Sequence, residues 1–508
     1  MKLLRYTILF TLLLSVTPQL SAQELPCGTT GDSEWLQRYF AGEIPPVPKF
    51  ASVSYVPTRM VIVGQDDGTG YLNPFTVLNS LKQLNEDFTP ADIQFYLSDI
   101  EYFNDSDLYD HDAPSTGRNI IRQNAEPGVL NVYFVERPGN TGGYAVDFND
   151  NKIAVRNAQA GTDGHTFSHE VGHALDLRHT FFGWEAFGDV SDRDPNEPAP
   201  RVILGTSSTF EVEKANGSNC DQAGDGFCDT PPDYLFIQSG WNCNSNGEYQ
   251  DSLTDPDGIR FAVPGNNYMS YSSSACQDGF SAEQITVMQT SLAFQSGIRE
   301  DNSQVGAVPA DGADMNLLFP EDRSTTEWSN FVELEWNSVP NADLYMIQLN
   351  VNRNFGGSVF RTFFTRDTTA IVEEGLVADR RYYWRVRPLN AYQVDSDFGD
   401  QVWQFRTGEN AVSSIDPALD AAITLMPNPV NGGQDLRISG RDLGVSGQLN
   451  YQLIDPAGRI LLSRENISVA ASTGFSERIE TAELPAGVYF LRLRLNDKLV
   501  TRRVMVTP

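Results

Sequence analysis

The residues most able to do chemistry in this chain are histidines, because four of its five histidines lie in one short stretch: His165, His169, His173 and His179. On a helix, His169 and His173 stand one turn apart on the same face, so both imidazoles can reach one zinc ion at about 2.0–2.1 Å. Glu170, beside the first of them, can accept a proton from the attacking water. The HExxH spacing predicts a hydrolytic metal site, although the motif alone also occurs by chance in many helices.

The last histidine of the group makes this prediction more specific. His179 follows His173 by six residues, and in a continuous helix it would face away from the metal. The helix must therefore end between them, usually at a glycine, and here Asp176 stands in that place. Aspartate is one of the few other residues that enter the left-handed region, so we expect Asp176 to make the turn and His179 to be the third ligand. His165 is expected to be a polar neighbour, and a distant glutamate ligand is disfavoured.

The elements that must position these side chains are predicted from hydrophobic periodicity. The runs "MVIVG" (60–64) and "LNVYFV" (130–135) are β-branched or aromatic and indicate strands, whereas "FTVLNSLKQLNEDF" (75–88) has the period of an amphipathic helix packed on a sheet. Pro/Gly/Asp-rich linkers follow near residue 306 and again near residue 408, and short alternating strands follow each. We therefore predict a multidomain chain, with an α/β (α+β) catalytic domain followed by two all-β sandwich domains.

Length, charge and the first residues limit the class of protein and its partners. A chain of 508 residues should form three or four domains, and its net charge of −31 repels nucleic acid and anionic membranes. Residues 1–22 have the basic start, apolar run and small-residue end of a secretory signal peptide. No later segment has about 18 consecutive apolar residues, so no transmembrane segment is expected in the mature, exported protein.

The cysteines are expected to be oxidised, because an exported chain meets an oxidising compartment. Cys220, Cys228, Cys243 and Cys276 lie close together in the sequence, and two disulfides are the expected outcome. Spacing alone leaves the connectivity open. Cys27 is left over as a free thiol, an intermolecular bridge or a ligand.

Four motifs resemble those of one protease family. "HEVGHALDLRHTF", "GDGFCDTP", "NNYMSY" and "CQDGFSAEQ" occur in the order and spacing seen in pappalysin-type metzincin metalloproteases. The resemblance implies a catalytic domain over residues 48–300, with the last three histidines of the group as zinc ligands and Glu170 as general base. It also implies that Met269 forms a hydrophobic floor under the metal and that Tyr271 binds the oxyanion of the reaction. Ordinary core roles for Met269 and Tyr271 are the alternative.

The same resemblance bears on the disulfides. In related proteases a cysteine seven residues after the methionine bridges to the preceding loop, which implies the pair Cys243–Cys276 and leaves Cys220–Cys228.

The resemblance also implies two further metal contacts. Related proteases hold a structural calcium ion in the loop that here reads "DQAGDGFCDTPP", which implies Asp225 and Thr230 as calcium ligands; a solvated acidic turn is the alternative. In the family, a cysteine followed by Gly-Thr in the pro-segment can fill the open zinc position. Residues 23–47 are therefore expected to be a pro-segment, with Cys27 as the fourth zinc ligand of a zymogen or, alternatively, as a free thiol.

The remaining chain resembles two known kinds of domain. Residues 301–410 resemble a fibronectin type III domain, in which Trp336 lies on an early core strand and Leu376 and Tyr382 form the tyrosine corner. Residues 420–508 resemble the C-terminal sorting domain of the type IX secretion system, on "LMPNPVNGG", "DPAGR" and "LPAGVYFLRL". This implies the outer-membrane secretion machinery as a partner and a secreted or surface-attached protein of a Gram-negative bacterium.

Two functions of different classes fit these features. The first is a secreted zinc endopeptidase acting on proteins or peptides, and the second is a catalytically inactive surface protein that uses the same domains for adhesion. The loop after Met269 reads "SSSAC" and has no carboxylate before Cys276. In the family that this chain resembles, members that prefer basic residues tend to carry an acidic residue in this loop, so the resemblance implies no strong preference for arginine or lysine in the substrate.

Overall fold

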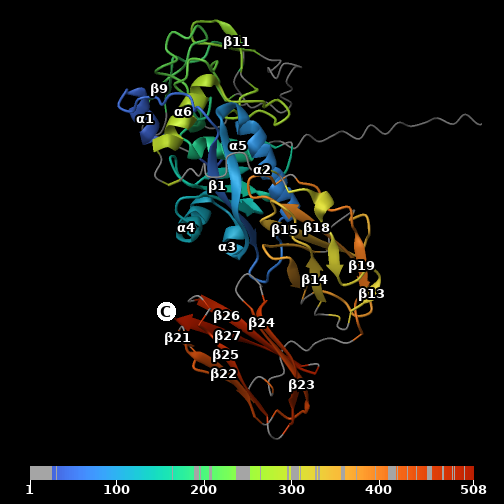
Figure 1. The fold of residues 1–508 in the computed structure, drawn as a ribbon. Helices are drawn as coiled ribbons and strands as arrows, with labels where there is room; N and C mark the ends of the chain where they lie inside the picture. Colours follow the sequence, from blue (N-terminus) through green and yellow to red (C-terminus); the bar gives the residue numbers. More distant parts are fainter. Residues whose placement is uncertain are drawn as a thin grey trace, which may run out of the picture.

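The structure is a computed structural model, with a mixed α/β region followed by two β-sandwich regions (Figure 1). It describes residues 26–507 except 30, 163, 188–193, 195, 205–208, 236–251, 264, 295–296, 299–307, 309, 327–328, 330–331, 356–360, 373–374, 395, 410–418, 420–421, 429, 432, 442, 455–459, 472–473, 483, 485–486 and 497. The expected signal peptide (1–22) and Cys243 lie outside these residues. No helix among the described residues is both long and apolar enough to cross a membrane.

A five-stranded sheet forms the centre of the first region, in the order β2-β1-β4-β7-β6. Its strands are β1 (Ser54–Gly64), β2 (Ile93–Asn104), β4 (Leu130–Val135), β6 (Gly143–Ala145) and β7 (Lys152–Arg156). β1, β2, β4 and β7 are parallel, and β6 runs antiparallel to β7 at one edge. β1 and β4 contain the two apolar runs that the sequence predicts as strands, and every residue of β4 is buried.

Helices cover both faces of this sheet. They are α1 (Glu34–Phe40), α2 (Pro74–Phe88), α3 (Ser106–Tyr109), α4 (Pro114–Asn124), α5 (Thr166–Ala174) and α6 (Ala282–Phe294). One core contains residues of α2, α5 and α6, and a second core on the other face contains residues of α3 and α4. α2 starts at Asn73, whose side chain accepts from Phe75 N, with Pro74 in the first turn, where no backbone donor is needed.

Short elements complete the first region. They are 3₁₀ helices at Thr89–Ala91, Asn157–Gln159 and Trp184–Phe187 and the two-stranded pairs β3 (Asp110–His111) with β5 (Arg137–Pro138), β8 (Val202–Leu204) with β9 (Thr209–Glu211), and β10 (Ser252–Thr254) with β11 (Arg260–Ala262).

The second region is a sandwich of a three-stranded and a five-stranded sheet, with a 3₁₀ turn at Gly312–Asp314. The first sheet is β12 (Leu317–Phe319), β14 (Val332–Trp336) and β17 (Thr369–Val372); the second is β13 (Ser324–Thr325), β19 (Trp403–Arg406), β18 (Arg381–Leu389), β15 (Leu344–Asn350) and β16 (Arg361–Thr365). Trp336 and Tyr382 are buried between the sheets, and Val377 N donates to the Tyr382 hydroxyl over 2.9 Å. This hydrogen bond fixes the chain at the tyrosine corner.

The third region is a separate sandwich with its own core (red in Figure 1). One sheet holds β20 (Ile423–Met426), β22 (Asp435–Gly440) and β25 (Phe475–Glu480); the other holds β21 (Val430–Asn431), β27 (Lys498–Thr507), β26 (Gly487–Leu495), β23 (Gly447–Ile454) and β24 (Ile460–Val469).

The second region packs directly against the edge strand β2 of the first. Leu97 N donates to Ala391 O over 2.8 Å, and the Tyr96 and Tyr392 rings stack with their centroids 4.3 Å apart. The core that contains α2 and β2 also includes four apolar residues of the second region: Leu344, Met346, Leu389 and Val394. The two regions therefore share one continuous hydrophobic core.

Candidate metal centre

The end of α5 brings three histidines to one point. His169 and His173 lie one turn apart on this helix, which ends at Ala174. Asp176 follows with φ +74°, in the left-handed region, and Leu177 N bonds back to Gly172 O over 2.9 Å. This turn reverses the chain and returns His179 to the face of the helix that carries the other two rings.

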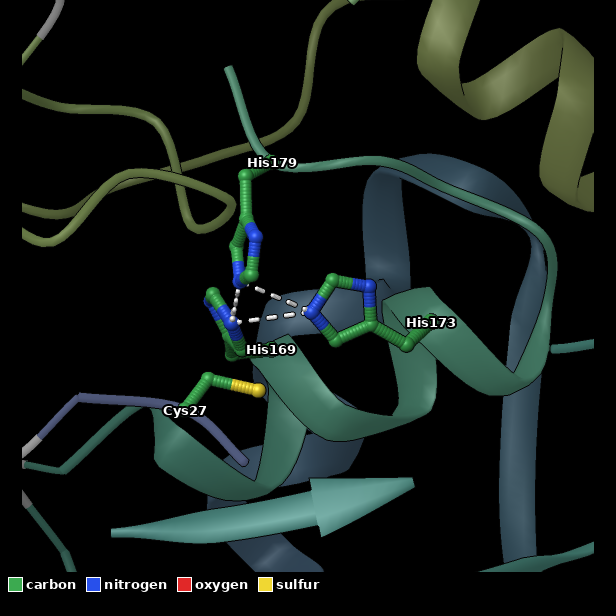
Figure 2. Close-up of side chains that lie close together, drawn as sticks. All are labelled: Cys27, His169, His173 and His179. Carbon is green, nitrogen blue, oxygen red and sulfur yellow. Dashed lines mark hydrogen bonds between the residues drawn. The ribbon is translucent and has the colours of Figure 1, made fainter. Parts of the chain in front are cut away.

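The three imidazoles face one another through their Nε2 atoms (Figure 2). These atoms are 3.1 Å apart between His169 and His173, 3.1 Å between His173 and His179, and 3.2 Å between His169 and His179. Cys27 Sγ joins them, so that the four ligand atoms all lie within 4.8 Å of one another. Among the described residues this is the one group of His, Cys, Asp or Glu side chains with metal-ligand geometry.

The hydrogen bonds of the three Nδ1 atoms indicate which nitrogen of each histidine ring carries the proton. Nδ1 of His169 lies 2.7 Å from Tyr268 O, that of His173 2.7 Å from Leu177 O, and that of His179 2.9 Å from a Glu185 carboxylate oxygen. Each Nδ1 faces an acceptor and must carry the proton, so in neutral rings the three Nε2 atoms are unprotonated and their lone pairs converge. Such an arrangement is repulsive unless a cation lies between them.

The arrangement fits a tetrahedral metal ion. Ligands at about 2.0–2.1 Å from tetrahedral zinc stand roughly 3.3 Å apart, close to the separations of the three nitrogens. Burial lowers the pKa of His169 to about 3, and it lowers the pKa of His173 well below its ordinary value. Both rings are therefore neutral, as metal ligands must be.

Glu170 lies beside the metal point in a dry environment. Its carboxylate is fully buried, and burial raises its pKa to about 8 despite hydrogen bonds that oppose the shift. Oε2 lies 3.3 Å from Cys27 Sγ and 3.2 Å from Thr29 Oγ1, whereas Oε1 has no hydrogen-bond partner among the described residues. Oε1 is thus the Glu170 carboxyl oxygen that is left without a partner beside the metal point.

Met269 packs against α5, and the Tyr271 ring lies beside the rings of His169 and His179. Met269 is fully buried, and a Cβ atom at Gly172 of α5 would lie 2.5 Å from its sulfur. Only glycine therefore lets this helix approach the methionine so closely. The Tyr271 hydroxyl accepts from Cys27 N over 2.9 Å and donates to Cys27 O over 3.3 Å.

The segment before α1 occupies the cleft along β6. Gly28 N donates to Gly143 O over 2.8 Å, and Gly142 N donates to Pro26 O over 3.0 Å. Figure 2 shows the Cys27 side chain reaching toward the three rings. Burial, and after it Glu170, raises the pKa of the Cys27 thiol, but a cation at the Nε2 point would favour the thiolate.

Asp176 does more than turn the chain. Its carboxylate accepts from Ser33 Oγ over 2.5 Å, Asn149 Nδ2 over 2.5 Å and Ser291 Oγ over 2.7 Å. Burial raises the pKa of Asp176, and these three hydrogen bonds oppose the shift. A glycine could make the turn but could not join the segment before α1 to the loop after β6 and to α6.

A second link holds the same segment. Asp32 accepts from Arg178 Nε over 2.5 Å and from Arg178 Nη2 over 2.7 Å, an ion pair with two parallel hydrogen bonds. Arg178 immediately precedes His179, so this contact lies next to the metal point. The segment is therefore held by hydrogen bonds to β6, to Asp176 and to Arg178.

The acidic loop gathers buried carboxylates but does not by itself form a metal-ligand group. Thr230 Oγ1 lies 3.0 Å from both carboxylate oxygens of Asp225. Burial raises the pKa of Asp225 to about 8, and burial, followed by the charges of Asp225 and Asp233, raises that of Glu213 to about 9. The sequence singles out Asp225 and Thr230, whereas Glu213 approaches them only in the fold.

The other predicted residues are placed as follows. Cys220 and Cys228 form a disulfide, and Cys276 is also disulfide-bonded, while its expected partner Cys243 lies outside the described residues. His165 Nδ1 lies 2.8 Å from an Asp87 carboxylate oxygen and is absent from the group of ligand atoms.

Two contributors to the site have no signal in the sequence. Glu185 orients His179, and Arg118, on α4, donates to the backbone of the segment that occupies the cleft. A glutamate six residues after a histidine, or an arginine on a distant helix, has no spacing rule that marks it.

Known proteins resemble two parts of the chain. Residues 424–507 match the family model of the secretion system C-terminal sorting domain. An extracellular metalloprotease of Colletotrichum graminicola is 28% identical over 242 residues, which cover 44% of this chain and 69% of that protein. An extracellular metalloprotease of Uncinocarpus reesii is 27% identical over 228 residues, with 45% and 71% covered. A solved promirolysin mutant from Tannerella forsythia is 20% identical, covers 54% of this chain and 95% of its own, and has a TM-score of 0.35.

The histidine geometry and the sequence similarities together support a metal-dependent protease, and residues 424–507 form a C-terminal secretion sorting domain. The relatives imply a bound metal, and the histidine group can hold one. The sorting domain indicates export of the protein.

Proposed function

We propose that residues 48–300 form the catalytic domain of a secreted zinc endopeptidase of the pappalysin type. The observation that carries this proposal is the convergence of three unprotonated Nε2 atoms 3.1–3.2 Å apart, next to the buried carboxylate of Glu170. The domains proposed beside it are a signal peptide (1–22), a pro-segment (23–47), a fibronectin type III-like domain (301–410) and a type IX sorting domain (420–508).

The chain's own residues account for the proton transfers of peptide hydrolysis. Zinc, when bound, polarises the peptide carbonyl and lowers the pKa of water. Glu170 accepts the proton of the attacking water on its free oxygen and then delivers it to the leaving amine. The Tyr271 hydroxyl, once Cys27 has left, donates to the oxyanion that develops on the carbonyl oxygen. Glu185 and the two carbonyl acceptors keep the histidine rings oriented throughout.

The same geometry supports a latent precursor. Cys27 supplies a fourth ligand atom within 4.8 Å of the three nitrogens, and its backbone occupies both hydrogen-bonding sites of the Tyr271 hydroxyl. A peptide substrate cannot reach the metal point or β6 while this segment is in place. We propose that removal of residues up to about 47 activates the enzyme.

Metal content and proteolysis of the exported chain test the proposal. We expect one zinc per chain by elemental analysis, and chelator-sensitive cleavage of an unfolded protein after removal of the pro-segment. Glu170→Gln should keep the zinc and lose activity about 10²–10⁴-fold, because the base is lost but the ligands remain. Glu197→Gln is the matched control, since this glutamate is exposed, and it should retain activity.

The alternative is an inactive surface protein that uses these domains for adhesion. Absence of zinc, with no cleavage after removal of the pro-segment, would support it. A Glu170→Gln enzyme with more than about a tenth of the wild-type activity would instead leave the metal site intact and remove Glu170 from the role of base.

A further inference from the structure

A hollow beside the cleft lies between the pro-segment and α4. It has a volume of about 630 Å³, and it lies on the side of the metal point where the chain continues from β6 toward Asn149. After the pro-segment leaves, the remaining wall is formed by Arg118, Arg122 and residues 145–149. Three charged side chains are thus left facing this space, namely two arginines and one aspartate.

The two arginines differ in how they are paired. Arg122 Nη2 lies 2.7 Å from an Asp147 carboxylate oxygen, so its charge is already neutralised. Arg118 donates from Nη2 to Gly28 O over 2.9 Å and to Ala145 O over 3.3 Å, and both acceptors are neutral carbonyls. Its Nε is buried and has no hydrogen-bond partner within the described part of the chain. Arg118 therefore has no carboxylate at hydrogen-bonding distance among the described residues, although its charge lies close enough to Glu170 to oppose the rise in the pKa of that group.

Arg118 is also held rigidly in this position. Its guanidinium lies over the Tyr144 ring, 5.2 Å from the centroid, and the Tyr144 hydroxyl contacts His111 Nε2 at 3.1 Å. A Cβ atom at Gly117 would clash with that hydroxyl, so α4 packs tightly against β6. Because the guanidinium is positioned in advance, little side-chain entropy is lost when a ligand binds it.

In this structure the pro-segment occupies the space beside Arg118. Gly28 lies on β6 and gives its carbonyl to Arg118, and two residues with carboxylates, Asp32 and Glu34, line the same hollow further along the segment. A peptide bound along β6 in the active enzyme replaces the Gly28 carbonyl and places one of its side chains at the mouth of the hollow.

We propose that Arg118 is a specificity-determining residue that selects substrates with an aspartate or glutamate at one position beside the scissile bond. This inference rests on the proposed peptidase function and names a substrate class for the same cleft. An acidic side chain would supply the partner that the Arg118 guanidinium lacks, through a charge-assisted hydrogen bond. Asp147 does not act as the anionic partner of Arg118, because it is already paired with Arg122.

The test compares peptides within one enzyme. The exported chain, cut in solution after its pro-segment, is assayed with a peptide series in which each position near the cleaved bond carries glutamate or glutamine. We expect kcat/KM to favour glutamate about tenfold at one position, as a partly buried charge-assisted hydrogen bond would give. In Arg118→Gln the ratio should fall to about one, whereas Arg118→Lys should keep part of it and Arg118→Glu should invert it, so that the glutamine peptide is preferred.

Arg122→Lys is the matched control, one turn along the same helix, because it keeps a cation for Asp147 and should retain the preference. Failure of the wild-type enzyme to cleave any peptide would count against the peptidase function. Cleavage without an acidic preference, or a preference that survives in Arg118→Gln or disappears in Arg122→Lys, would overturn the role of Arg118. Zinc content and circular dichroism establish that each variant is folded, and Arg118→Lys decides the matter if Arg118→Gln does not fold.

Discussion

Replacement of Asp176 by glycine tests whether this residue only makes the turn or also anchors the pro-segment. From the sequence, Asp176 is a substitute for the usual turn glycine, so restoring glycine should be neutral or stabilising. In the structure its carboxylate accepts three hydrogen bonds, from Ser33, Asn149 and Ser291. Three such bonds contribute roughly 3 kcal/mol, and relief of the left-handed conformation returns roughly 1–2 kcal/mol. We therefore expect Asp176→Gly to destabilise the precursor by roughly 1–2 kcal/mol.

Urea unfolding of the precursor, followed by tryptophan fluorescence, measures this change. Asp176→Asn is the control, because asparagine also enters the left-handed region and can still accept hydrogen bonds, so it should lose less. Removal of the pro-segment removes the Ser33 hydrogen bond, which is one of the three. The destabilisation caused by Asp176→Gly should then be smaller by about 1 kcal/mol. An Asp176→Gly precursor at least as stable as the wild type would refute the anchoring role and leave only the turn.

Three further predictions follow from the site and its surroundings. Cys27→Ala should give a precursor that is active or digests itself, because the fourth ligand position opens; a variant that stays inert while the trimmed enzyme is active would contradict this. If the acidic loop binds calcium, millimolar calcium should raise the melting temperature of the wild type but not of Asp225→Asn, in differential scanning calorimetry. Burial lowers the pKa of His111, so stability present above about pH 6.5 should be lost as the pH falls through that lowered pKa. In urea unfolding, His111→Gln should show a smaller loss between about pH 7.5 and about pH 5.5 than the wild type, and an equal loss would rule His111 out as the cause.

The sequence predicts those parts of the molecule whose signals are local. The helix over residues 75–88 and the strands that contain 60–64 and 130–135 appear as expected, because apolar periodicity reports burial directly. The left-handed turn at Asp176 is likewise a property of one residue and its neighbours.

Contacts between distant segments could not be predicted in the same way. Ser33 reaches Asp176 across 143 residues, and this contact leaves no periodic pattern because it depends on how separate elements pack. Glu185 lies only six residues from His179, but no spacing rule marks a glutamate at that distance as its partner. Arg118 is the clearest case, since its place beside the cleft depends on the close packing of α4 against β6.

The contact between Leu97 and Ala391 bears on where the chain can be cut into parts that fold on their own. β2 is an edge strand, and an open edge with apolar neighbours is a template for pairing with other chains. Here the second region covers that edge and contributes Met346 and Leu389 to the core beneath it. The linker near residue 306 therefore marks a change in composition rather than the limit of a cooperative folding unit. A chain ended after residue 300 would retain every proposed catalytic residue, yet we expect it to aggregate, because the edge of β2 and the apolar residues beside it would be uncovered.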